Sequence, residues 1–202
     1  MKATSRRACI ALCSWASLLL GCVAFVTHPY RPFTPIPSPG LTEKPSIALF
    51  FDRAGQLNGR PLTGRSENAA RLRSRMVQRY QDSGLFEVVD PGASASADYW
   101  VEVNAWADVD SPFALHIVGT LTACLIPIVM YESVTLTTRV IDRSGADRGA
   151  FTTTGKATLV CSPFMAPFLV SNEQWSQIFR LSDALTDQAI LQAMQAGAFT
   201  RP

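Results

Sequence analysis

Residues of the types that most often carry out chemistry are few in this chain, and they lie far apart in the sequence. Its two histidines, His28 and His116, stand in a proline-rich stretch and an apolar stretch, and neither has a metal-ligand spacing around it. Asp108 and Asp110 alternate along an expected strand, so they could hold a hard cation, although a solvated strand end is the interpretation we prefer. Asp52 follows an apolar run without a recognisable partner, and no nucleophile motif is present. We therefore predict no enzyme, no cofactor and no metal site.

The five cysteines are the remaining reactive side chains. Cys9 and Cys13 lie in the first apolar run, and Cys22 ends that run. Cys124 and Cys161 lie in two later apolar stretches, where an oxidising compartment would permit a disulfide between them. The alternative, which we prefer, is that both are small buried hydrophobic side chains.

The chain begins with the order of a secretory signal peptide, in which the basic "MKATSRR" precedes the apolar "ACIALCSWASLLLGC". The end of that run, Leu19–Cys22, resembles the bacterial lipobox. This resemblance implies that residues 1–21 are removed, that the Cys22 sulfur receives a diacylglyceryl group and that the new amino terminus is fatty-acylated, for example with palmitate. Several acyl chains on one residue hold a protein firmly on a membrane. An uncleaved anchor from Ala8 to Val26 is the alternative.

The residues after Cys22 predict a location and a spacer. Val23 follows the cysteine where an Asp would retain the protein at the inner membrane, so similarity to enterobacterial sorting rules implies the outer membrane, facing the periplasm. Inner-membrane anchoring is the alternative. Residues 22–45 form a proline-rich tether expected to be extended over some tens of ångströms. Its prolines are Pro29, Pro32, Pro35, Pro37, Pro39 and Pro45.

Residues 46–202 are expected to form one α+β domain with a mainly antiparallel sheet in the order β-α-β-β-β-β-α. The predicted strands are 46–51, 85–90, 99–110, 133–142 and 149–160, and the two helices cover about 66–83 and 171–196. In the third strand, Tyr99, Val101, Val103 and Ala105 share one face. In the first helix, Arg71, Arg75 and Arg79 form a stripe that we expect to be solvated, the alternative being contact with anionic lipid or a partner.

Two apolar segments, 112–131 and 159–170, interrupt this domain. The first has no charged residue but contains Pro127, and the second is too short to cross a bilayer. Because both adjoin one hairpin, they should emerge at the same end of the sheet as a paired apolar lobe, with a bend near Pro127. Helices of the same domain could instead cover it. The residues predicted to contact a membrane or a partner are Phe113, Leu121, Leu125, Ile128, Phe164, Met165 and Phe168.

The segment "LTACLIPIVMYESVTLTTRVIDRSG" resembles one in uncharacterised bacterial envelope lipoproteins, where an apolar run ending in "LIP" precedes a "YTLT"-like strand and an Asp-x-x-Gly turn. The fold this implies is similar to small βαβ modules of envelope lipoproteins and transport-auxiliary subunits, and it brings no catalytic residues. The net charge of +2 gives no reason to expect a nucleic-acid partner. We expect a non-enzymatic, lipid-anchored envelope protein. A transport-auxiliary subunit that binds a lipid or another apolar ligand is the alternative.

Overall fold

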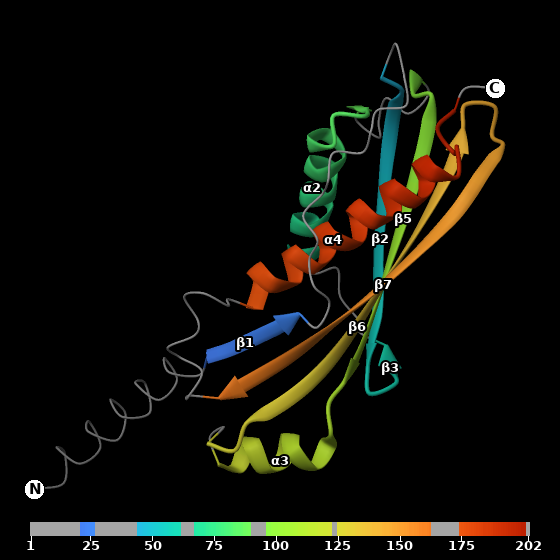
Figure 1. Ribbon diagram of the computed structural model, residues 1–202. Helices are drawn as coiled ribbons and strands as arrows, with labels where there is room; N and C mark the ends of the chain where they lie inside the picture. Colours follow the sequence, from blue (N-terminus) through green and yellow to red (C-terminus); the bar gives the residue numbers. More distant parts are fainter. Residues whose placement is uncertain are drawn as a thin grey trace, which may run out of the picture.

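The computed structural model describes residues 21–26, 44–61, 67–89, 96–122, 125–162 and 174–200 (Figure 1). Their elements are β1 (Gly21–Val26), β2 (Ser46–Leu57), β3 (Arg60–Pro61), α2 (Glu67–Asp82), β4 (Glu87–Val89), β5 (Tyr99–Asp110), α3 (Phe113–Leu121), β6 (Ile128–Asp142), β7 (Asp147–Ser162) and α4 (Gln174–Gln195). Each predicted strand has a counterpart in this series. The described residues also contain two strands and one helix, β1, β3 and α3, that the sequence did not predict.

All strands belong to one sheet in the order β1-β7-β6-β5-β2-β3, with β4 also paired to β2. The expected α+β class is confirmed, but the sheet is mixed, because β2 runs parallel to both β4 and β5. The reason is α2, which carries the chain back along the sheet so that β4 enters in the same direction as β2. The remaining pairs are antiparallel.

Helices α2 and α4 both lie against one face of this sheet (Figure 1). The predicted alternation in β5 is confirmed, since Tyr99, Val101, Val103 and Ala105 are all buried beneath the helices. The opposite face of the sheet is called the open face here, because no helix covers it among the described residues. Its exposed side chains include Phe50 and Trp106.

Two arginine–aspartate pairs join α2 to α4. Arg75 donates through Nε and one terminal nitrogen to Asp183 at 2.8 and 2.7 Å, and Arg79 binds Asp187 in the same forked manner. The two arginines of α2 are four residues apart, and so are the two aspartates of α4. The two pairs therefore lie one helical turn from each other. The prediction that this stripe is solvated is therefore wrong for Arg79, whose side chain is 22% exposed, whereas Arg75 remains 44% exposed although it pairs with Asp183.

The central hairpin is longer than predicted. It joins β6 and β7 through a turn in which the Asp142 carboxylate accepts hydrogen bonds from the backbone N–H groups of Ser144 and Ala146 at 2.9 and 3.0 Å. Its far ends, Ile128–Tyr131 and Leu159–Ser162, are strand. Parts of both predicted apolar segments therefore belong to the sheet, and the alternating burial of strands explains much of their apolar character.

Candidate functional site

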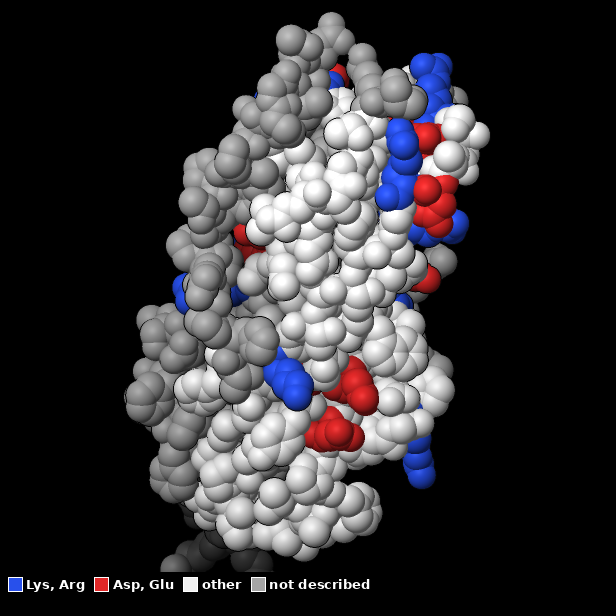
Figure 2. All heavy atoms as spheres, turned by 45° about the vertical axis from the view of Figure 1, so that its right-hand side comes forward, with Lys and Arg blue, Asp and Glu red and all other residues white. Residues whose placement is uncertain are grey.

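The lower end of the sheet in Figure 1 carries α3, which contains His116 but no Asp, Glu, Lys or Arg. Three of the predicted contact residues are strongly exposed there, with 75% of Phe113, 81% of Leu121 and 59% of Leu125 accessible to solvent. In Figure 2 the described spheres at the bottom of the molecule are white, a group of red and blue spheres lies above them, and one blue side chain at the lower right extends down toward their level. We call α3 with Leu125 and Ile126 the α3 lobe. It is an uncharged apolar surface of the kind that seldom remains in water.

Helix α3 is held on the sheet by a close contact between Gly119 and Ile128. A Cβ atom at position 119 would lie 2.3 Å from Ile128 Cγ1, so the helix approaches β6 closely only because this residue is glycine. Ile128 is only 7% exposed as a result. The prediction that Ile128 contacts a membrane or partner is therefore wrong, because its side chain is buried against α3. Phe164, Met165 and Phe168 lie outside the described residues, so the pairing of the two apolar segments stays a prediction.

The chain turns back after α3 at Thr122, earlier than the expected bend near Pro127. The Thr122 hydroxyl donates to the carbonyl of Val118 at 2.8 Å and accepts a hydrogen bond from the Ile126 N–H at 3.3 Å. This side chain thus occupies backbone groups that the helix end leaves unpaired. Strand β6 begins directly after Pro127. Among the described residues, no helix is long and apolar enough to cross a membrane.

The predicted lipidation site is part of the sheet. Residues Gly21–Val26, expected at the signal-peptide boundary and in the tether, form β1 and pair with β7, with Cys22 opposite Cys161. Cys161 is in turn opposite Ile128 of β6. Since neighbouring strands are about 4.8 Å apart, the Cys22 backbone lies roughly 10 Å from that of Ile128, the residue against which α3 packs. The candidate anchor and the α3 lobe therefore share one end of the sheet.

Cys161 is disulfide-bonded, which differs from the preferred expectation of a free buried thiol. The predicted partner, Cys124, lies outside the described residues, and the Cys124–Cys161 pairing stays a prediction. A bond at Cys161 joins the end of β7 to another part of the chain. It therefore restricts the same end of the sheet that carries the α3 lobe.

The open face carries exposed aromatic side chains that the sequence analysis did not assign to a site. Phe25, Trp106 and Tyr131 are 44%, 46% and 55% exposed, and they come from β1, β5 and β6. The alternation in β5 already placed Trp106 opposite the buried face, so its exposure could be predicted. The exposure of Phe25 could not, because this residue stood in a segment interpreted as tether.

A buried carboxylate lies near the same end of the sheet. Glu132 is 7% exposed and faces the helix side of β6, between Val109 and Ala157 on the adjacent strands. Burial raises the pKa of Glu132, and the positive charge of Arg53 opposes that rise. A carboxylate kept away from water in this way favours its neutral form.

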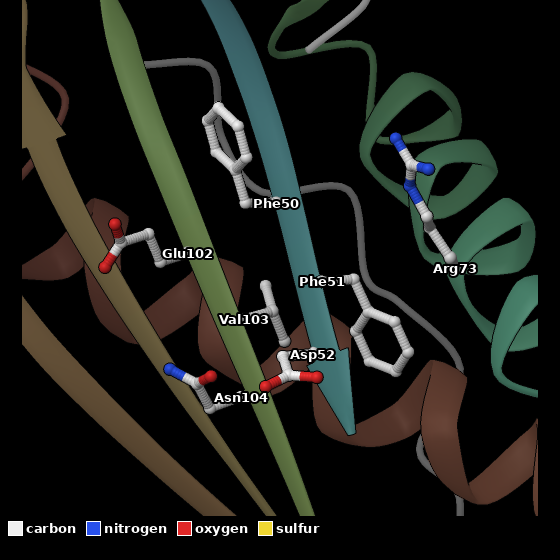
Figure 3. Close-up of a pocket in the computed structure, with 7 residues that line it drawn as sticks. All are labelled: Phe50, Phe51, Asp52, Arg73, Glu102, Val103 and Asn104. Atoms are coloured by element: carbon white, nitrogen blue, oxygen red, sulfur yellow. The ribbon is translucent and has the colours of Figure 1, made fainter. Parts of the chain in front are cut away.

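The acidic residues considered for chemistry, Asp52, Asp108 and Asp110, lie on β2 and β5. A hollow of about 500 Å³ is lined by Phe50, Phe51, Asp52, Arg73, Glu102, Val103 and Asn104. Figure 3 shows the Arg73 guanidinium pointing away from the Asp52 carboxylate, which accepts a hydrogen bond from the Arg53 N–H at 2.9 Å. Asp108 accepts one from Gln56 Nε2 at 3.1 Å. In the part of the chain that the structure describes, no group of three or more His, Cys, Asp or Glu side chains could hold a metal ion.

No family model matches the chain, and no curated protein matches it. Among solved structures, it is similar to a dodecamer of a PelC point variant from Paraburkholderia phytofirmans, at 14% sequence identity and a TM-score of 0.37. That similarity covers 83% of this chain and 94% of the PelC chain. A TM-score this low establishes neither a shared fold nor a shared function.

Proposed function

We propose that this chain is a non-enzymatic lipoprotein of the bacterial cell envelope, anchored through acylated Cys22, whose α3 lobe contacts a membrane or a membrane-protein partner. The outer membrane, with the domain facing the periplasm, is the proposed location. The observation that carries the proposal is the position of Cys22 in β1, one strand away from Cys161 and two from Ile128. An acyl group there would hold the uncharged α3 lobe against the lipid surface.

The position of β1 also changes how the anchor works. A long flexible tether would leave the domain free to turn, and the α3 lobe would meet the membrane only occasionally. With Cys22 already in the sheet, the anchor fixes which end of the domain faces the bilayer. The effective concentration of the α3 lobe at the lipid surface is then high without a further contact.

Metabolic labelling with palmitate tests the anchor. The parent protein and a Cys13→Ala variant, in which the altered cysteine lies in the signal peptide, should incorporate label. A Cys22→Ala variant should not incorporate it. Equal labelling of Cys22→Ala and the parent would exclude the lipoprotein proposal, whereas loss of label from Cys13→Ala would indicate a general effect on export.

The second candidate function is a transport-auxiliary subunit that binds a lipid or another apolar ligand. The observation that favours it is the exposed apolar surface of α3, which a bound ligand could cover as well as a membrane could. Native mass spectrometry of the full chain released from detergent distinguishes the two functions. A bound lipid of defined mass and stoichiometry would favour the carrier, and its absence favours membrane contact.

A further inference from the structure

On the open face, one row of residues across neighbouring strands separates an uncharged end of the sheet from a part that carries charged side chains. The register aligns Phe25 of β1, Thr158 of β7, Tyr131 of β6 and Asp110 of β5. The two aromatic residues are 44% and 55% exposed, and their backbones lie about 10 Å apart across β7. Beyond this row, toward the tip of the α3 lobe, the described residues of these strands and of the lobe include no Asp, Glu, Lys or Arg.

The next row in the opposite direction is charged. It aligns Lys156 of β7, Ser133 of β6 and Asp108 of β5, two residues further along each strand. Two residues advance a strand by about 7 Å. The open face therefore passes from an uncharged end, through a row with two aromatic side chains, to a row with charges. That order is the order of a bilayer interface, in which aromatic rings lie between hydrocarbon and water.

We propose that a lipid bilayer meets this protein in a plane at the Phe25–Tyr131 row, with the α3 lobe inserted below it and Lys156 and Asp108 in water above it. This inference rests on the proposed function and deepens it, because it selects a lipid surface over a protein partner. The position of Cys22 agrees with this plane. Cys22 precedes Phe25 by three residues in β1, so its acyl chains start about 10 Å further toward the lipid.

The charges near the plane also define the kind of lipid. Lys156 and Arg60 are matched at this level by Asp108, Asp110 and the buried Glu132, so its described residues carry no excess of positive charge. A surface that recognises anionic lipid needs an excess of basic residues. The protein should therefore insert equally well into vesicles of neutral phospholipid, and salt should have little effect on its depth.

Spin-label depth measurements on the full acylated chain test this plane in phosphatidylcholine vesicles. A label is introduced singly by Leu121→Cys, Tyr131→Cys or Thr154→Cys, and its collisions with oxygen and with a water-soluble nickel complex are compared. The oxygen-to-nickel ratio should be several-fold higher at position 121 than at position 154, with position 131 between them. Adding anionic lipid or salt should leave this order unchanged.

Two matched aromatic variants test whether an effect on insertion depends on the position of the ring in the proposed plane or follows from the loss of any exposed ring. With the label at position 121, Tyr131→Ala should shift the label toward water. Trp106→Ala should not shift it, because Trp106 is comparably exposed on the same face but two rows above Tyr131.

The outcomes are distinguishable. A label at 121 in lipid with 131 as aqueous as 154 would overturn the plane but leave the proposed membrane contact intact. Equal exposure of 121 and 154 to the nickel complex would overturn the membrane contact itself. Shielding of 121 in native envelopes but not in vesicles would overturn the plane in favour of a protein partner.

Discussion

Cys22 of β1 lies directly opposite Cys161 of β7 in the antiparallel ladder, and Cys161 is disulfide-bonded. A thioether to lipid and a disulfide both use the single free valence of a cysteine sulfur, so an acylated Cys22 cannot be the partner of Cys161. If Cys9 and Cys13 leave with the signal peptide, Cys124 is the cysteine that remains. Acylation would thus determine the disulfide pairing as well as the location of the protein.

We therefore predict a Cys124–Cys161 disulfide in the acylated protein, formed as a periplasmic disulfide oxidoreductase accepts the two electrons. Peptide mapping without reduction should recover that linked pair. Cys161→Ser should lower the free energy of unfolding by about 2–4 kcal/mol, the usual effect of losing a native disulfide. Reduced parent protein is the control and should lose a similar amount. A recovered Cys22–Cys161 link would contradict both the pairing and the acylation of Cys22.

The ion pairs between α2 and α4 give a prediction for stability. The Arg79 and Asp187 side chains are 22% and 10% exposed, and burial raises the pKa of Asp187 although the bound Arg79 lowers it. Arg79→Met should lower the free energy of unfolding by about 3 kcal/mol, because it removes the positive charge that compensates the burial of the Asp187 carboxylate. Denaturant titration measures this loss. The more exposed Arg75 of the neighbouring pair provides the comparison, and Arg75→Met should have the smaller effect.

Local patterns predicted the parts of this fold that depend on local burial. The alternation from Tyr99 to Ala105 and the hairpin around Asp142 are both as expected, since each follows from periodicity or turn residues. Strand β1 was missed because its apolar residues continue those of the signal peptide, and only pairing with the distant β7 makes them a strand. The burial of Ile128 depends in the same way on Gly119, a contact that no periodicity encodes.

The pH dependence of stability should include a contribution from Glu132. Burial raises its folded-state pKa above the unfolded value, so its protonated form favours the folded protein, and that stability is lost as pH rises through the folded-state pKa. Glu132→Gln should therefore raise the melting temperature near pH 7, with the gain shrinking toward about pH 4, because the parent residue becomes protonated as the pH falls. Thermal scans across this range measure the difference. A gain that is the same at both pH values would show that the charge of Glu132 is not its cause.

The packing of α3 against β6 should tolerate no side chain at position 119. Gly119→Ala places a Cβ 2.3 Å from Ile128 Cγ1, so α3 must move away from β6. We expect a loss of about 1–3 kcal/mol in the free energy of unfolding and faster hydrogen exchange in α3 than in the rest of the domain. Combining Gly119→Ala with Ile128→Ala removes the clash and should restore slow exchange in part. Unchanged exchange in the single variant would show that α3 is not held by this contact.

The exposure of Leu121 separates a surface role from a structural one. Leu121 is 81% exposed and Ile128 is 7% exposed, although both lie in the apolar segment 112–131. Leu121→Arg should therefore change the free energy of unfolding by no more than about 0.5 kcal/mol, whereas Ile128→Arg should unfold the domain because it buries an unpaired charge.

In a Cys22→Ala background, Leu121→Arg should also release the protein from membranes, since a charge at depth costs about 2.5–3.5 kcal/mol. Sedimentation of envelopes measures this release, and Thr154→Arg, on the far side of the charged row, should remain bound. Release by Thr154→Arg to the same extent would show that the α3 lobe does not hold the protein on the membrane.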